Sequence, residues 1–291
     1  MAKRNSSWSN QKLDAYIKEG RGQGELENYK PWTTIHDFSS MGRATRIKGW
    51  KTNRIHHLQS DIMLKFFYLL EWEKDVIDIR ESFPLIDLYD EIGDNEDLEF
   101  NLFRDKQTDE PYVLTTSFLV TINNEGKNKY IARSIKNSYE LEKKISLEKL
   151  EIERRYWKKK KIDWAVITEK EIPIEKSKNI EWIHSSLFAY KDIGLDENRL
   201  YVLCRYFIKD LIDNNDATVR EVISNFENNY INFSEPGIGI FILKFLIANK
   251  ILLIDINKKI NLENSCKNFI KNISNDFWGD INVNQEFSLQ L

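Results

Sequence analysis

The chain has 291 residues, enough for about two domains of ordinary size. Hydrophobic residues make up 41% and aromatic residues 12%, which excludes a disordered tail or a low-complexity scaffold. Its 43 Lys and Arg nearly balance its 46 Asp and Glu, so any attraction to nucleic acid must come from a local patch rather than from overall charge.

Cysteine usage and hydropathy bear on where the protein works. Cys204 and Cys266 lack metal-ligand spacing and suggest neither a disulfide framework nor a zinc site. The N-terminus has no signal-peptide pattern, and polar or charged residues interrupt the most apolar stretch, 237–256. We therefore expect a cytoplasmic protein that does not span a membrane.

The N-terminal half predicts a mixed α/β sheet with helices on its faces. The glycines of GRGQGE at 20–25 do not follow a strand and suggest a flexible arm. Residues 85–99 hold seven acidic residues and no basic one, which predicts a solvated, mobile loop. The predicted elements, in chain order, are a buried helix over 59–73, a strand and turn ending at Pro84, strands over 111–123 and 129–136, a long crossover helix over 139–161, and a strand over 163–168.

Beyond Pro173 the pattern becomes mainly helical. Helical spacing recurs over 178–188, 196–213 and 216–228 and is followed by the apolar stretch 237–250. Two alternating runs then flank Asn257–Lys259, which predicts a two-stranded wing. We therefore predict an α/β domain over 1–169 and a mainly α, winged-helix domain over 170–291.

Positive charge gathers between residues 41 and 57, where no acidic residue occurs. The cations are Arg43, Arg46, Lys48, Lys51 and Arg54. Five neighbouring cations could neutralise DNA phosphates and give a salt-dependent, sequence-independent affinity. An ordinary solvated arm explains the same pattern equally well at this point.

Two other polar groupings carry less functional weight. A second basic run, 154–161, ends the long predicted helix, where cations favour the negative end of the helix dipole, so we interpret it as a helix terminus. His56 and His57 adjoin Asp61, but this spacing is a weak metal signal. We favour structural or DNA-contacting histidines.

Several separated segments carry a family resemblance. They are GRGQG, PWTTIHDF, GR..RI.G.KT.R.HHL.SD, LEWE..V.DIRE.FPL, T.FLV and LEKLE.ERRYW.KK.I.W. In order and spacing, over roughly residues 5–185, they resemble the TnsA family, the endonuclease subunit of bacterial heteromeric transposases that cuts the 5′ ends of the element. Ten or so identities in one order are more specific than any single motif in the chain.

The resemblance implies a restriction-endonuclease-like α/β N-terminal domain and a winged-helix C-terminal domain. The partners it implies are transposon-end DNA, a TnsB-like transposase and, through the C-terminal domain, a TnsC-like ATPase. It also implies a metal site in which an acid on the early helix, an Asp on one strand and an (E/Q)xK on the next hold Mg²⁺ and prepare a water for attack.

This sequence departs from the family pattern at that site. The helix acid falls on Met63, the strand Asp on Ser117 and the Gln on Ser134, and only the Lys is kept, as Lys136. A thioether and two neutral hydroxyls cannot supply the anionic oxygens that Mg²⁺ requires. We therefore expect no cofactor and a pseudoenzyme, with Met63 filling space where a metal ligand stood.

Two other functions stay open. One is an active, Mg²⁺-dependent endonuclease in which a carboxylate at another position has rebuilt the site. The candidates for this migrated carboxylate are Asp61, Glu71, Glu73 and Glu81. Asp61 lies about 200° around the helix from Met63 and so faces the wrong way, and Glu73 lies about 15 Å along the helix axis. Neither restores the missing strand Asp. The other is a general DNA-binding regulator that uses only the winged helix.

Overall fold

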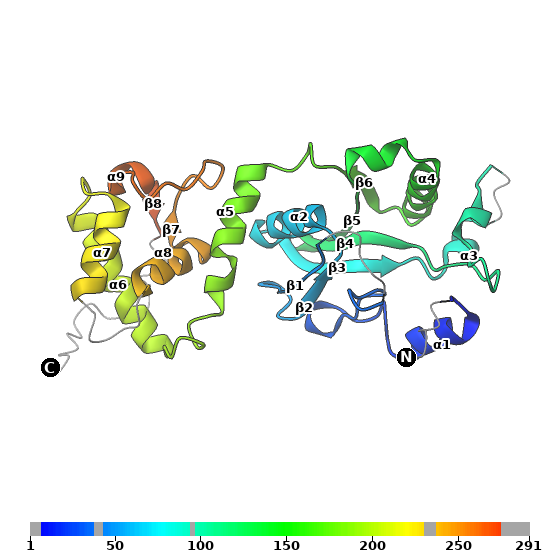
Figure 1. Cartoon of the computed structure of the whole chain (residues 1–291), viewed down its shortest axis with the longest axis horizontal. Coiled ribbons are helices and arrows are strands. Elements are labelled where there is room, and N and C mark those ends of the chain that lie inside the picture. Colours follow the sequence, from blue (N-terminus) through cyan, green and yellow to red (C-terminus); the bar gives the residue numbers. More distant parts are fainter. Residues whose placement is uncertain (1–6, 38–42, 94–96, 230–236, 275–291) are drawn as a thin grey trace. The chain divides into compact units, whose positions relative to one another are not determined.

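The computed structural model describes residues 7–37, 43–93, 97–229 and 237–274 (Figure 1). The chain divides into two compact units between Pro173 and Ile174. Within the described ranges, no helix is both long enough and apolar enough to cross a membrane.

The N-terminal unit is built on a four-stranded sheet in the order β3-β4-β5-β6 (Figure 1). Its strands are β3 (Val76–Pro84), β4 (Thr115–Asn124), β5 (Lys127–Ile135) and β6 (Asp163–Ile167). The first three pair in antiparallel fashion, whereas β5 and β6 are parallel. Because parallel neighbours need a crossover, α4 (Lys144–Lys159) connects them. The predicted mixed α/β sheet and its crossover helix are confirmed.

One helix packs on each face of this sheet. α2 (Asp61–Trp72) places the ring of Phe66 at 5.9 Å from the ring of Phe118 on β4. Side chains alternate along a strand, so the next residue, Leu119, faces the opposite way and packs in a core with Trp157 of α4. The helix predicted over 59–73 is therefore present, with its ends shifted by one or two residues.

The N-terminal segment is packed against the sheet, which makes the prediction of a flexible arm wrong. α1 (Asn10–Lys18) and the short 3-10 helix η1 (Leu26–Asn28) lie in it, and Trp8, Tyr16 and Trp32 form a small aromatic core. Gly22 has a φ of +75°, and a Cβ there would lie 2.3 Å from Cγ of Pro84. The glycine thus permits a close approach to β3 rather than providing mobility.

The acidic segment 85–99 is anchored to α4 and is not the solvated loop that its charges predicted. It contains α3 (Leu88–Ile92), and Leu85 and Leu88 are buried in the core beside α4. Lys160 Nζ lies 2.5 Å from a carboxylate oxygen of Asp87 and 2.7 Å from one of Glu91. The basic end of α4 therefore neutralises part of the acidic segment. Residues 94–96 lie outside the described residues.

The N-terminal unit also contains four short elements among its described residues. They are the hairpin strands β1 (Thr45–Lys48) and β2 (Ile55–Leu58), and the 3-10 helices η2 (Phe100–Phe103) and η3 (Ser138–Glu142). Asn137 caps η3, and its backbone amide donates to the carboxylate of Glu140. This capping fixes the chain directly after β5, where the resemblance places a functional lysine.

The C-terminal unit is mainly helical, as predicted. Its elements are α5 (Ile174–His184), η4 (Ser185–Leu187), α6 (Glu197–Asp213), α7 (Val219–Asn229), α8 (Ile238–Ala248), β7 (Leu252–Leu253), α9 (Cys266–Phe269) and β8 (Asn272–Ile273). Phe207 and Phe226 meet edge to face in its core, with ring centroids 5.1 Å apart. Cys204 and Cys266 are buried free thiols, and burial raises the pKa of Cys204 well above its usual range.

The wing predicted around Asn257–Lys259 does not form as a hairpin of neighbouring runs. β7 pairs instead with β8, about twenty residues further on. The amide of Asn179 on α5 donates to the carbonyls of Ile256 and Lys258, at 2.8 and 2.7 Å. The hydrogen-bonding needs of these two carbonyls are met by a side chain of α5 and not by a neighbouring strand. The segment is therefore a loop, although its alternating pattern favoured a strand.

Candidate functional site

Met63 lies in the first turn of α2, at the position that the resemblance assigns to a metal-binding acid. Its backbone N–H donates to the Ser60 hydroxyl that caps the helix, at 3.3 Å, and its side chain is buried. Asp61, two residues earlier, is exposed, which agrees with the opposite helix face expected for it. Met63 is therefore a buried apolar side chain at this position. Asp61, the carboxylate of the same helical turn, does not take the place of the missing acid.

Ser117 lies next to the end of β5, as the resemblance requires. The ladder between β4 and β5 begins one residue later, at Phe118 opposite Arg133. The hydroxyl oxygen of Ser117 accepts a hydrogen bond from the backbone N–H of Ile135 at 2.9 Å. Ser117 therefore joins β4 to the residue between Ser134 and Lys136.

Ser134 belongs to a buried polar network on the α4 side of the sheet. Its hydroxyl donates to the carboxylate of Glu153 and accepts from the indole N–H of Trp164 at 3.0 Å. The same carboxylate oxygen accepts from the hydroxyl of Thr116 at 2.8 Å. Lys149 Nζ lies 3.5 Å from the other oxygen of Glu153. Both oxygens of this carboxylate are therefore engaged within the protein.

Lys136 follows β5 directly and is tied to its own neighbourhood. Its backbone N–H donates to the carbonyl of Ile167 at 3.1 Å, and its Nζ lies 3.3 Å from a carboxylate oxygen of Glu140, one helical turn on. The structure thus brings Ser117, Ser134 and Lys136 together. α2 reaches the same region through Phe66, which lies one turn after Met63. The ring of Phe66 contacts the ring of Phe118, the residue after Ser117.

The donor set at these positions does not fit Mg²⁺. A thioether and two hydroxyls offer no anionic oxygen, and the hydroxyls already make hydrogen bonds to protein groups. Among the described residues, no three His, Cys, Asp or Glu side chains gather closely enough to hold a metal ion.

The other carboxylates considered as migrated ligands have different partners. Glu71 is buried and accepts a hydrogen bond from the backbone N–H of Trp50, and Glu73 is an exposed cap at the end of α2. Glu81 is fully buried and ion-paired. None of these three rebuilds the set of oxygens that the family pattern implies.

The cations between 43 and 54 do not form one surface. Arg46 and Lys48 lie two residues apart on β1, are exposed and share a face of the hairpin. Arg43 is exposed and Lys51 half-buried. Arg54 is buried, so its assignment as a DNA contact is wrong, and a phosphate reaches at most the other four side chains. Met41 and Gly42, at the start of this run, lie outside the described residues.

Arg54 instead forms a buried ion pair that attaches the β1–β2 hairpin to β3. Its two terminal nitrogens donate to the two carboxylate oxygens of Glu81, at 2.8 and 2.5 Å, and one also donates to the carbonyl of Ile79 at 2.7 Å. His56 Nδ1 donates to Glu81 at 2.8 Å, and its Nε2 lies 2.7 Å from the hydroxyl of Thr52. His56 is thus a structural histidine.

Electrostatics around Glu81 favour its charged form. Complete burial on its own would raise the pKa of this carboxyl. The charge of His56 and the hydrogen bonds from Arg54 and His56 outweigh burial and hold the pKa of Glu81 well below its usual range. The pair is therefore ionised at neutral pH and contributes to the fold rather than to chemistry.

Sequence reasoning did not single out Glu153, and it considered Glu81 only as a migrated metal ligand, not as the partner of Arg54. Glu153 lies three residues after Leu150 and four before Trp157, on the buried face of α4. An acidic residue on an otherwise apolar helix face is the signal that could have identified it. Glu81 is preceded by Arg80 in the sequence, and nothing local indicates that its partner is Arg54.

Comparisons with known proteins show which family this chain is similar to. A family model described as TnsA-like endonuclease N terminal matches residues 73–169, and one described as TnsA endonuclease C terminal matches residues 171–256. The transposon Tn7 transposition protein TnsA of Escherichia coli is 43% identical over 186 residues. That match covers 64% of this chain and 66% of the E. coli protein, just under two thirds of its length.

Proposed function

Since this chain belongs to the TnsA family, we propose that it is a transposition subunit that keeps the binding roles of the family and lacks its nuclease activity. In this proposal the N-terminal unit binds transposon-end DNA and a TnsB-like transposase. The C-terminal unit binds a TnsC-like ATPase. The chain then organises the assembly without cutting the 5′ strands.

The observation that carries the proposal is the chemistry at positions 63, 117 and 134. Two of these side chains, Ser117 and Ser134, make hydrogen bonds within the protein, and the third, Met63, is buried and apolar. The competing function is an active nuclease. The carboxylate that would serve it is Glu153, which accepts a hydrogen bond from Ser134. Its oxygens are engaged by Ser134, Thr116 and Lys149, which argues against a role as a metal ligand.

The products of transposition test this proposal. If the 5′ strands stay attached to the donor, joining of the 3′ ends should give cointegrates, in which donor and target are fused. We expect cointegrates to dominate when this chain is supplied with its transposase and ATPase. Long-read sequencing of the products measures their proportion. Simple insertions as the main product, in cells without a resolving recombinase, would contradict the proposal.

DNA binding through the hairpin predicts a specific salt dependence. Replacing both Arg46 and Lys48 with alanine should reduce the slope of log K against log salt by up to about 0.9 for each lost phosphate contact. Fluorescence anisotropy with a transposon-end duplex at several salt concentrations measures this slope. The matched control is Lys127→Ala with Lys129→Ala, an exposed pair two residues apart on β5. Equal slopes for both double variants would place the DNA site elsewhere.

We also propose that the C-terminal unit is a winged-helix variant that folds alone. In support, the helices α6, α7 and α8 directly precede β7, and Thr218, just before α7, forms an isolated bridge with Ser265. We expect a fragment over 170–291 to unfold cooperatively and to bind a TnsC-like ATPase, with little affinity for DNA. Circular dichroism and a pull-down with both ligands provide the measurement. Strong DNA binding without ATPase binding would overturn this assignment.

A further inference from the structure

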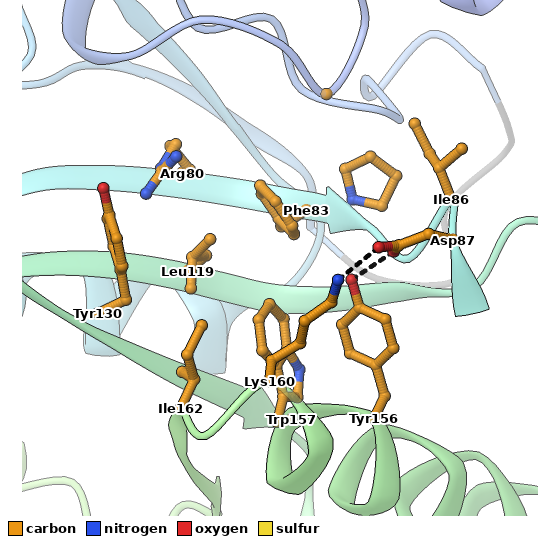
Figure 2. Close-up of a pocket in the computed structure, with 12 residues that line it drawn as sticks. Arg80, Phe83, Ile86, Asp87, Leu119, Tyr130, Tyr156, Trp157, Lys160 and Ile162 are labelled. Atoms are coloured by element: carbon orange, nitrogen blue, oxygen red, sulfur yellow. Dashed lines mark hydrogen bonds and ion pairs between the residues drawn. The ribbon is translucent and has the colours of Figure 1, made fainter. Parts of the chain in front are cut away.

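The N-terminal unit has a hollow of about 390 Å³ between the sheet and α4, which we call the β3–α4 slot. Phe83, Leu119, Trp157 and Ile162 form its apolar floor, with Arg80 and Tyr130 at one end and Lys160 and Tyr156 at the other (Figure 2). It lies on the face of the sheet that carries Leu119. The family-assigned positions Met63, Ser117, Ser134 and Lys136 are not among its lining residues.

Each end of the slot has one cation that faces two carboxylates. Lys160 is paired with Asp87 and Glu91, at 2.5 and 2.7 Å. Arg80 Nε lies 3.4 Å from the buried carboxylate of Asp78, and Arg80 Nη1 lies 3.7 Å from Glu25, whose side chain is largely exposed. In the ion pairs at each end, two carboxylates therefore face one cation, and Asp87 lines the slot beside Lys160.

This charge pattern disfavours a phosphate-bearing ligand. A nucleic acid would bring further negative charge to two ends where carboxylates outnumber the paired cation, and both cations are already paired with carboxylates. The cations also cover aromatic faces. Arg80 lies over the ring of Tyr130 at 5.2 Å, and Lys160 lies over the ring of Tyr156 at 5.6 Å. The surface that remains available to a ligand is therefore the apolar floor between the two ends.

The rim adds apolar surface that a partner could cover. Ile86 is 47% exposed and Tyr130 is 38% exposed, one on each side of the floor (Figure 2). Exposed apolar side chains beside a hollow of this kind are typical of sites that accept one anchoring side chain. The slot thus combines an apolar centre with ends at which carboxylates outnumber the paired cation.

We propose that the β3–α4 slot docks a protein segment in which one large apolar side chain is flanked by Lys or Arg. The apolar side chain occupies the floor, and the flanking cations meet Glu25 at one end and Asp87 and Glu91 at the other. This goes beyond the proposed function, because it assigns a protein-docking surface to the N-terminal unit whether or not the chain cuts DNA.

A random dodecapeptide library displayed on phage tests the proposal with the full-length chain as bait. We expect enriched peptides to share one Trp, Phe, Leu or Ile with Lys or Arg on both sides. Synthetic copies should bind at least tenfold more weakly to a variant carrying Ile86→Ser and Tyr130→Ala. The matched control carries Ile145→Ser and Tyr139→Ala, which are 49% and 60% exposed and do not line the slot.

A second variant tests the charges. Glu25→Gln with Glu91→Gln should weaken the same peptides severalfold at 50 mM salt and much less at 500 mM, because screening removes the electrostatic part. The proposal is overturned by failure to enrich any peptide, by an acidic consensus, or by equal loss of binding in the slot variant and its control. Binding of a transposon-end duplex that the slot variant loses and the control keeps would also overturn it.

Discussion

Replacing Arg54 with alanine should lower the free energy of unfolding of the N-terminal unit by about 3–5 kcal/mol, because the change leaves the Glu81 carboxylate buried without its main partner. Glu81→Gln should act in the same direction, since it leaves the Arg54 guanidinium buried beside a neutral amide. Urea unfolding followed by tryptophan fluorescence, together with the thermal midpoint, measures both effects in the intact chain.

Arg46→Ala is the matched control, because it removes the same side chain from an exposed position on the same hairpin. A surface change of this kind should alter the free energy of unfolding by less than about 0.5 kcal/mol. Because Arg54 is buried, Arg54→Ala should weaken DNA binding only under conditions in which the β1–β2 hairpin unfolds. Equal and small destabilisation by the two arginine variants would show that the buried pair contributes little.

A triple variant carrying Met63→Glu, Ser117→Asp and Ser134→Gln should gain Mg²⁺ binding, whereas we expect the natural chain to bind none. The changes at 117 and 134 return hard oxygen donors to the end of β5, next to the retained Lys136, and the change at 63 returns one to α2, one turn before Phe66, which contacts Phe118. Single changes should do little, because one carboxylate does not hold Mg²⁺ against water. Calorimetric titration with Mg²⁺ and nicking of an end duplex provide the two measurements.

The structure also indicates what the triple variant has to overcome. Ser134 is almost fully buried against Glu153, so glutamine there adds volume to a closed space, at a stability loss of about 1–3 kcal/mol. The variant must therefore be shown to be folded first. Adding Lys136→Ala to it should leave Mg²⁺ binding and slow nicking by about 10²–10⁴-fold. A folded triple variant that does not bind Mg²⁺ would show that the positions no longer converge.

Local pattern was enough to predict the sheet and the crossover helix, because β-branched and aromatic runs report burial directly. The positions of the strand that ends at Pro84 and of the helix that ends near 158–161 are set by residues close to them in sequence, so a local pattern predicts them. Arg54 depends on a partner 27 residues away. A cation beside four other cations looks like part of a DNA surface until its burial against Glu81 is known.

The acidic segment and the wing were mispredicted for the same physical reason. Charge along 85–99 indicates a solvated loop only if no cation meets it, and Lys160 and Arg155 of α4 do so. Alternation along 251–262 indicates a hairpin only if its carbonyls need strand partners, and Asn179 binds two of them. Long-range side-chain partners decided both segments, and such partners leave no periodic signal.

The absence of carboxylates at positions 63, 117 and 134, in contrast, can be read from the sequence once the resemblance fixes the register, and the loss of metal binding stays a prediction. The structure adds what now occupies each position. Met63 is buried, Ser117 joins β4 to β5, and Ser134 is part of a network around Glu153. These contacts are what a former site would retain if its positions were adapted to packing rather than to metal binding.

The most direct test of the account is a cleavage assay with 5′-end and 3′-end labelled transposon ends. The natural chain is combined with its transposase and ATPase partners in the presence of Mg²⁺, and both strands are followed on a denaturing gel. We expect cuts at the 3′ ends, made by the transposase, and none at the 5′ ends above the level seen without this chain. Mg²⁺-dependent 5′ cutting that requires the chain and disappears in Lys136→Ala would contradict the account.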